Sequence, residues 1–178
     1  MTHKWASMEF SQWGKDPSNT GVDPEVLKNI VKSSVEIPDT VKPHSRLTRM
    51  HIAHRLKSIE EDKFDWATAE AMACGSLTID GYNVRIVGED VERGTFSQRH
   101  VVFHDSESLG GSKSTTPLRD SKFMREHAKG RFAALNTNLN ELGTMGYEYG
   151  YSLENPNNLC LWEAQFGDFY NPAQLIVD

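Results

Sequence analysis

The 178-residue sequence predicts an α/β fold, in which a mostly parallel sheet with flanking helices is preceded by a helical N-terminal arm. Three apolar segments rich in strand-forming residues, 83–88, 131–135 and 159–164, carry this prediction together with a helical pattern at 140–153. Strands that alternate with helices favour parallel pairing through right-handed crossovers. We therefore expect one mostly parallel sheet with flanking helices, which with only three readable strands would expose its edges and an uncovered face.

The N-terminal third is predicted to hold an irregular segment followed by two helices. Residues 1–22 are polar and aromatic without a period. Asp23-Pro24-Glu25 has the composition of a helix start: a capping carboxylate, a proline in the first turn and an acid at the positive end of the dipole. Residues 44–62 predict an amphipathic helix whose apolar positions are Leu47, Met50, Leu56 and Ile59. We expect residues 1–62 to form an arm with helices, apart from the α/β domain.

The predicted α/β domain spans residues 63–178. Asp65 is expected to cap a helix that ends at Asp80-Gly81. The predicted buried side of this helix is formed by Trp66, Ala69, Met72, Ala73, Ser76 and Leu77. After the first strand we expect a long loop to about residue 130, of which residues 105–117 are poor in apolar side chains and predicted to be mobile. The last helix opens at Asn171-Pro172 and has only about two turns, so we expect the domain to be incomplete at its C-terminus.

Charge and composition disfavour several classes of protein. The net charge of −6 argues against a nucleic-acid binder, including one that would use residues 42–57, because neutralising phosphates needs a basic face. No apolar run reaches the roughly 20 residues of a membrane helix, so no membrane partner is expected. Cys74 and Cys160 lie in apolar patterns, which favours buried free thiols over a disulfide.

A run of nine residues from Leu161 to Phe169 is the most informative segment of the chain. It combines a tryptophan, two acids, an amide and two phenylalanines directly after an apolar strand. A second polar run, Gly88 to Phe96, follows the strand at 83–88 in the same way. Open α/β proteins bind ligands at the carboxyl ends of their strands, so we expect a binding site at this edge of the sheet.

Glu141 lies in the first turn of the helix at 140–153. A carboxylate at this position complements the helix dipole, and from the residues alone this structural role stays open beside a catalytic one. Glycines at 143, 146 and 150 permit a close approach of the helix to a neighbour or a ligand. Glu148, two turns further along the helix, is better placed for a structural hydrogen bond.

Together, residues 88–96, 140–150 and 161–169 resemble the thiamine-diphosphate-dependent subunits of 2-oxo acid dehydrogenase complexes. They are most similar to the decarboxylating subunit of the 2-oxoglutarate dehydrogenase family and its 2-oxoadipate relatives. The resemblance covers most of the chain and is strongest at residues 65–104 and from Leu139 to the end. It implies a transketolase-like pyrimidine-binding domain that is truncated in this chain.

The resemblance implies a role for each residue of the signature segments. Glu141 is expected to be catalytic, because the corresponding family residue contacts the ring nitrogen of the cofactor's aminopyrimidine. Phe169 is expected to stack on that ring, with Gln165 and Phe166 as further cofactor contacts. Glu163 is expected to bond the ring or a neighbouring subunit. The ordinary alternative for both phenylalanines is packing in the core.

His100 and His104 resemble a His-bearing segment that the family keeps beside its active site, which makes them candidates for substrate contact. A solvated polar loop is the alternative. No third metal ligand follows them at a suitable spacing, and the segment is expected to be extended, so we predict no metal site in this chain. A basic run in residues 44–62 is expected on the solvent face of its helix or, alternatively, against an acidic partner. The run comprises His44, Arg46, Arg49, His51, His54, Arg55 and Lys57.

The chain departs from the family pattern in two respects. Asp120 stands where relatives usually place a histidine, within a loop that is longer than in the relatives. The family also binds magnesium and the cofactor's diphosphate on a separate upstream domain, through a Gly-Asp-Gly segment and a later asparagine that have no counterpart here. We therefore expect only the pyrimidine-binding half of a thiamine diphosphate site, with the magnesium ligands on a domain outside this sequence.

The function implied by the resemblance is that of a part of 2-oxoglutarate or 2-oxoadipate dehydrogenase. That enzyme decarboxylates its substrate and passes the acyl group to a lipoyl group on the dihydrolipoyl acyltransferase. The resemblance also implies the mitochondrial matrix and a dimer with a full-length decarboxylating subunit, without which the isolated chain would be inactive. The alternative is a non-catalytic fragment or divergent paralogue that acts as an interaction module.

Overall fold

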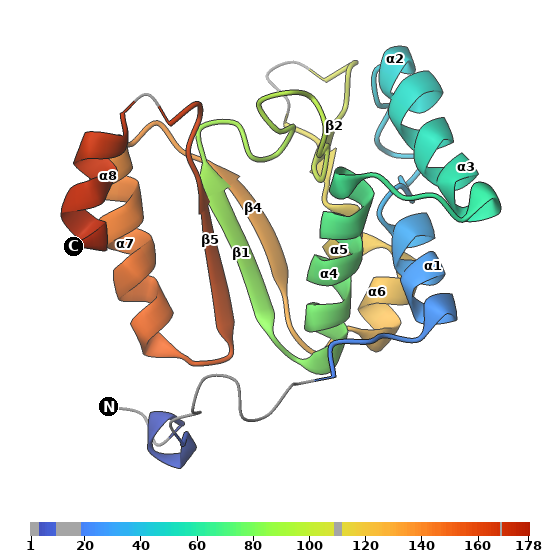
Figure 1. Cartoon of the computed structure of the whole chain (residues 1–178). Coiled ribbons are helices and arrows are strands. Elements are labelled where there is room, and N and C mark those ends of the chain that lie inside the picture. The colour runs from blue at the N-terminus through green and yellow to red at the C-terminus, as the bar shows by residue number, and fades with distance from the viewer. Residues whose placement is uncertain (1–3, 10–18, 109–111, 168) are drawn as a thin grey trace.

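The centre of the protein is a three-stranded parallel sheet (Figure 1). The computed structural model describes residues 4–9, 19–108, 112–167 and 169–178. Strand β1 (Asn83–Gly88) lies between β4 (Phe132–Asn136) and β5 (Asn158–Glu163). The register pairs Gly88 with both Asn136 and Glu163, so all three strands end at the same edge of the sheet. The three loops that follow the strands therefore meet at that edge.

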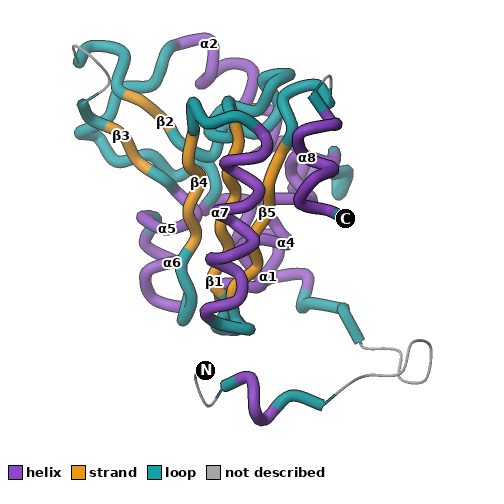
Figure 2. Tube along the Cα trace, turned by 90° about the vertical axis from the view of Figure 1, so that its left-hand side faces the viewer, coloured by secondary structure: helices purple, strands orange, loops and turns teal. Residues whose placement is uncertain are grey.

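The flanking helices are present as predicted, and they cover both faces of the sheet, where an uncovered face was expected. On one face, α4 (Trp66–Asp80) packs with α1 (Pro24–Ser33) and α6 (Lys122–His127), and α5 (Pro117–Asp120) packs against α1, α6 and β4. On the other face, α7 (Glu141–Glu154) packs on β5, and α8 (Tyr170–Val177) packs on α7. Figure 2 shows α7 running across the front of the sheet. The main core lies between the sheet and α4, and its buried members include Ile30, Ala71, Cys74, Val84, Ile86, Leu118, Met124 and Phe132.

The helix starts and stops have the predicted chemistry. Asp23 Oδ1 accepts a hydrogen bond from Glu25 N at 2.8 Å, and Asp65 Oδ1 accepts one from Thr68 N at 2.7 Å. Gly81 ends α4 with a φ of +100°, a left-handed conformation that a side chain disfavours. These ends depend on neighbours in the sequence, which is why the sequence predicted them.

The helix predicted at residues 44–62 is present, but its buried side was predicted wrongly. It consists of α2 (Ser45–Leu47), a π-helical turn η2 (Thr48–Ile52) and α3 (Ala53–Glu61). Met50 and Leu56, predicted to be apolar contacts, are exposed, whereas Arg55 is only 1% exposed. The π turn adds a residue to one turn and rotates the residues beyond it, so a constant period points the wrong side chains inward.

The buried side of α4 was also predicted wrongly. Trp66 is 93% exposed, and Ala69 and Ala73 are exposed as well, although Met72 is buried as expected. The buried positions are Thr68, Ala71, Met72, Cys74, Gly75 and Thr78. Helix α4 is apolar on most of its sides, so periodicity alone could not select the face that packs. Gly75 is part of the packed face, because a Cβ there would lie 2.4 Å from Cγ2 of Ile30 on α1.

The predicted long loop after β1 contains short elements that the sequence analysis missed. Besides α5 and α6, strands β2 (Phe103–His104) and β3 (Ser114–Thr115) form an antiparallel pair. Leu118 and Met124 are buried and tie this region to the core. Such short elements have too few residues to show a period. Residues 109–111, part of the segment predicted to be mobile, lie outside the described residues.

The two ends of the chain differ from the prediction in detail. A 3-10 turn, η1 (Trp5–Ser7), lies in the arm predicted to be irregular, and Trp5 Nε1 donates to the carbonyl of Leu153 at 2.8 Å. Residues 1–3 and 10–18 of that arm lie outside the described residues. Helix α8 begins at Tyr170, one residue before the predicted start. None of the described helices is both long enough and apolar enough to cross a membrane.

Candidate functional site

The candidate site lies at the edge where the three strands end. Gly88 and Glu163 are paired there, and a Cβ on Gly88 would lie 2.5 Å from the Glu163 carbonyl oxygen, so this close approach requires glycine. The N-terminus of α7 reaches the same edge, where Asn140 Oδ1 caps the helix by accepting from Gly143 N at 2.9 Å. The cap places Glu141 in the first turn, beside the ends of the strands.

Glu141 is half-buried and borders two hollows. The smaller, of about 10 Å³, lies between Glu141, Gly88 and Gln165. The larger, of about 160 Å³, lies between α7, α8 and the end of β5, and Trp162 and Phe169 share its walls with Glu141. Glu141 therefore borders one hollow with Gln165 and the other with Phe169. A half-buried carboxyl beside an aromatic wall can hold and exchange a proton with the edge of a flat heteroaromatic ring.

The two phenylalanines of the signature segment are exposed and are not part of the core. Phe169 is 62% exposed and Phe166 is 67% exposed. Phe169 faces the hollow beside Glu141, whereas Phe166 borders neither hollow. An aromatic face that is free of protein contacts is available to stack on a ligand or a partner.

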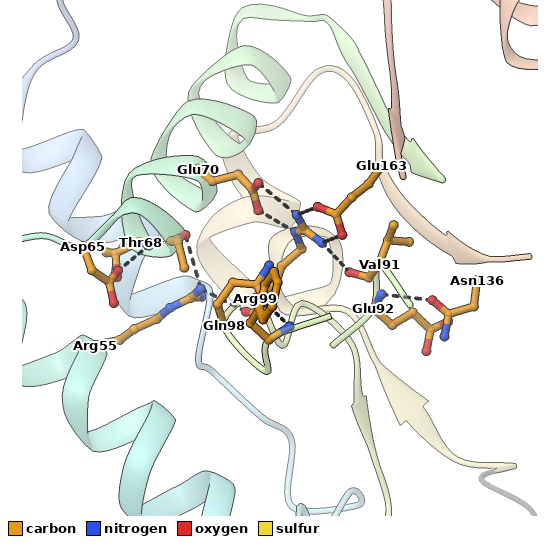
Figure 3. Close-up of polar contacts among 12 residues, drawn as sticks. Arg55, Asp65, Thr68, Glu70, Val91, Glu92, Gln98, Arg99, Asn136 and Glu163 are labelled. Atoms are coloured by element: carbon orange, nitrogen blue, oxygen red, sulfur yellow. Dashed lines mark hydrogen bonds and ion pairs between the residues drawn. The ribbon is translucent and has the colours of Figure 1, made fainter. Parts of the chain in front are cut away.

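The loop after β5 is bonded to the loop after β1. Thr95 Oγ1 donates to Gln165 Oε1 at 3.1 Å, so the Gln165 side chain has a partner within the chain. Glu163 accepts two hydrogen bonds from Arg99, one of them from Nη1 at 3.0 Å to Oε1 (Figure 3). The Glu163 carboxylate is therefore engaged inside this chain, where the resemblance led us to expect contact with the ligand or another subunit.

Arg99 is the centre of this network, and sequence reasoning missed it. Its side chain is 4% exposed. It donates through Nε to Glu70 Oε1 at 2.6 Å and through Nη1 to the Val91 carbonyl at 3.2 Å, in addition to its bonds to Glu163 (Figure 3). Burial lowers the pKa of Arg99, but the carboxylates of Glu163 and Glu70 outweigh burial and hold it above its usual value. No local pattern marks an arginine whose acid partners lie 29 and 64 residues away.

His100 and His104 border neither of the hollows beside Glu141. Both border a different hollow of about 400 Å³, whose walls include Glu92 and Asn136. His104 Nε2 lies 2.7 Å from Glu92 Oε2. The prediction that residues 97–105 are extended is wrong at His100, which has a left-handed φ of +44°. Within the described ranges, no cluster of three or more His, Cys, Asp or Glu side chains has the arrangement of a metal site.

Glu148 has the structural contact that its position on α7 predicted. It is buried, and its two carboxylate oxygens accept from Arg85 Nε at 2.8 Å and Nη2 at 2.9 Å. The Arg85 guanidinium also lies 5.0 Å from the centre of the Tyr151 ring, within cation–π distance. These contacts attach α7 to the central strand, two turns below Glu141.

Three further points from the sequence analysis concern the two cysteines, Asp120 and Arg55. Cys74 and Cys160 are free, as expected, and Cys74 is buried whereas Cys160 is half-buried. Asp120 accepts from Thr116 N at 2.8 Å and pairs with Arg119, so the residue that replaces the family's histidine has a local structural role. Arg55 is buried beneath the basic helix and does not lie on its solvent face, which corrects the prediction for that residue.

The candidate site lies in a part of the chain that matches a known protein family. Residues 62–178 match the family described as "Transketolase, pyrimidine binding domain". The chain is 45% identical over 177 residues to a probable 2-oxoadipate dehydrogenase complex component E1 homolog of Dictyostelium discoideum, covering 98% of this chain and 19% of that protein.

Two further relatives carry similar names. The mitochondrial 2-oxoglutarate dehydrogenase of Saccharomyces cerevisiae is 48% identical over 160 residues, covering 89% of this chain and 15% of that protein. The 2-oxoadipate dehydrogenase complex component E1 of Homo sapiens is 45% identical over 161 residues, covering 90% of this chain and 17% of that protein. The chain thus spans less than a fifth of the length of these relatives.

Proposed function

Because the chain belongs to the transketolase pyrimidine-binding domain family, we propose that it provides the pyrimidine-binding half of a thiamine diphosphate site. The observation that carries the proposal is the half-buried Glu141 facing Phe169 across a hollow at the carboxyl end of the sheet. The hollow, of about 160 Å³, is smaller than the roughly 300–1,000 Å³ of sites that enclose a whole ligand. It fits a part of the cofactor, with the remainder held elsewhere.

The residues around the hollow suit the aminopyrimidine ring. Glu141 would hold a proton against a ring nitrogen, and Phe169 would stack on the face of the ring. Gln165, oriented by Thr95, would present its amide to the same ring, and Phe166, which borders neither hollow, would add a contact only from outside them. When bound, thiamine diphosphate supplies the electron sink for decarboxylation of a 2-oxo acid.

The proposed reaction is that of the relatives whose names the comparisons give. The chain would contribute to oxidative decarboxylation of 2-oxoglutarate or 2-oxoadipate, with transfer of the acyl group to a lipoyl group on the dihydrolipoyl acyltransferase. His100 and His104 are the candidates for substrate contact, although they border a separate hollow in this chain. The name of the yeast relative supports the mitochondrial matrix as the location.

The other half of the site is proposed to come from another chain or domain. Magnesium and the diphosphate would be held there, since the relatives are more than five times as long as the matched region. A dimer with a full-length decarboxylating subunit would complete the site. The exposed aromatic side chains of the signature segment leave this edge open for such a partner.

Calorimetric titration of the 178-residue chain with thiamine diphosphate and magnesium tests the cofactor proposal. Glu141→Gln removes one charge-assisted hydrogen bond and is expected to weaken binding roughly tenfold. Glu154→Gln, an exposed acid at the far end of the same helix, is the matched control and should bind as the unchanged chain does. Equal binding by all three proteins would refute the role of Glu141. Absence of saturable heat from a folded chain would refute cofactor binding by this half alone and favour an interaction module.

A further inference from the structure

Helix α4 turns an apolar side toward solvent. Trp66, Ala69 and Ala73 are exposed on it, and the exposed fraction of Trp66 is 93%. Ser76 is half-buried, and Asp80, at the end of the helix, is exposed. These five residues, which we call the outward face of α4, follow one another at spacings of three and four residues. At 3.6 residues per turn, such spacings align them along one side of the helix.

The composition of α4 differs from that of an ordinary surface helix. Helix α3, which precedes it in the chain, exposes Lys57 and Glu60, as a helix that faces water normally does. Helix α4 contains only two charged residues, Glu70, which is bonded to Arg99, and Asp80 at its last position. A helix that is apolar on all sides is normally buried on all sides. The sequence of α4 is therefore that of a helix covered on its outward face as well as on its inner side.

The outward face of α4 is separate from the hollows described above. Helix α4 lies on the face of the sheet opposite α7, which carries Glu141 (Figure 1). In the part of the chain that the structure describes, none of the five residues borders the hollows beside Glu141 or those around His100. A partner on this face thus goes beyond the proposed cofactor function and leaves the candidate site open.

The outward face is complementary in shape to a second copy of itself. Trp66 lies at one end, and the positions that follow it carry small side chains. When two copies of α4 lie antiparallel, pairing Ala69 with Ala73 of the other copy also pairs Trp66 with its Ser76, because both pairs are centred on residue 71. Each indole then covers a small side chain, and the alanines allow the helix axes to approach to about 8 Å. Two-fold contacts between identical chains require such self-complementarity.

Charge favours the antiparallel arrangement over the parallel one. A parallel pair would set the two Asp80 carboxylates side by side and would place both Trp66 rings at the same end. An antiparallel pair places each Asp80 beside the start of the other α4, where the helix dipole is positive and Lys63 is exposed. The acid at that start, Asp65, already accepts from Thr68 N at 2.7 Å. The antiparallel pair thus avoids the like-charge contact of the parallel one.

We propose that two copies of this chain associate in an antiparallel, two-fold contact through the outward faces of their α4 helices. Burial of the two Trp66 rings supplies much of the affinity, since exposed tryptophans become the strongest contacts of many interfaces. Helix α4 has 15 residues and is about 22 Å long, so a contact along it buries less than the roughly 800 Å² per partner of a standard interface. We therefore expect a weak dimer with a dissociation constant on the order of 10 μM.

Sedimentation equilibrium of the 178-residue chain over about a hundredfold range of concentration tests the proposal. With rising concentration, the average mass should increase from the 20.1 kDa of one chain toward twice that value. A chain that stays monomeric over the whole range would overturn the proposal. Thiamine diphosphate and magnesium are left out, so the result is independent of the test of Glu141.

A pair of alanine variants locates the contact. Ala73→Glu places a carboxylate at the centre of the contact twice in each dimer, and is expected to weaken association about a hundredfold. Ala53→Glu makes the same substitution at an exposed position of α3 and should change the dissociation constant less than about twofold. Equal effects of the two variants, or an unchanged constant for Ala73→Glu, would overturn the assignment to α4. Both alanines are exposed, so the thermal unfolding of the dilute variants should match that of the unchanged chain.

Asp80→Asn tests the direction of the two helices. In the antiparallel contact the carboxylate lies beside a positive helix end, so its removal should leave the association unchanged or weaken it by up to about threefold. Stronger association of this variant would show that the two carboxylates repel each other in a parallel pair, and would overturn the antiparallel arrangement.

Discussion

Replacing Arg99 with methionine tests whether its network holds together the two loops of the candidate site. Methionine keeps much of the side-chain volume and removes the charge and all donors. Glu70 and Glu163 would then face each other without a cation, and the Val91 carbonyl would lose its bond. Removing one partner of a buried ion pair costs about 3–5 kcal/mol. The Glu70 and Glu163 side chains are 38% and 28% exposed, so water offsets part of this cost and we expect the lower end, about 3 kcal/mol.

Urea unfolding followed by circular dichroism measures the change in the free energy of unfolding. The matched control is Arg93→Met in the same loop, where the arginine is 50% exposed and pairs with Asp90. An exposed pair contributes less than about 1 kcal/mol, so the control should unfold almost as the unchanged chain does. A loss below about 1 kcal/mol for Arg99→Met, or equal losses in both variants, would refute the reasoning that burial makes this network strong.

Three further predictions address pH, thiol chemistry and the attachment of α7. Burial, with smaller effects of nearby cations, lowers the pKa of His51 to about 3, so the folded state favours the neutral ring. Its contribution to stability is full above about pH 6.5 and is lost as the pH falls toward 3, by about 2 kcal/mol at pH 5, and urea midpoints of the chain and of His51→Phe should differ accordingly. Burial raises the pKa of Cys74 to about 12, so a thiol reagent near pH 8 should modify the half-buried Cys160 first, and faster labelling of Cys74 would contradict this. Glu148→Ala leaves Arg85 without its carboxylate and should lower the free energy of unfolding by about 2–3 kcal/mol, whereas an unchanged urea midpoint would show that the pair is not stabilising.

Local chemistry made the strands and helix ends predictable from the sequence. The strand at 83–88 was predicted with its observed bounds, and those near 132 and 158 were predicted to within one residue at each end. Short apolar runs bounded by turn residues can be recognised as strands from the sequence alone. The caps at Asp23 and Asp65 bond atoms two or three residues away, so neighbouring residues suffice to predict them.

Side-chain burial was less predictable, because it depends on partners far along the chain. Arg55 is buried because acceptors from residues 34, 67 and 99 converge on it. Trp66 is exposed although tryptophan is usually well buried, since α4 is apolar on most sides and Ile30 contacts another of its faces. The π turn at Thr48–Ile52 shifts the period of α3, the helix that follows it, and no residue in the turn marks the extra position.

The candidate site was predictable in part for the same reason. The resemblance led us to expect Glu141, Gln165 and Phe169 at one edge of the sheet, and the strand order brings the start of α7 and the loop after β5, which carry them, to that edge. It did not predict Arg99, whose role arises only when α4 and the ends of β1 and β5 converge. His100 and His104 were expected beside the same site but border a different hollow.

The bonding around Glu141 separates a rigid part of the site from an open part. The helix that carries Glu141 is attached to the central strand by the Arg85–Glu148 pair, and the loop after β5 is held by Arg99. Phe169, in contrast, is 62% exposed at the end of the same loop. A group that exchanges a proton with a ligand must be positioned before the ligand arrives, because reorganisation during the reaction is costly. An aromatic side chain that closes on the ligand, or on a partner holding the ligand's other half, needs to remain accessible until then. A carboxyl on an anchored helix beside an exposed ring therefore fits the proposed half site, whose second half would come from elsewhere.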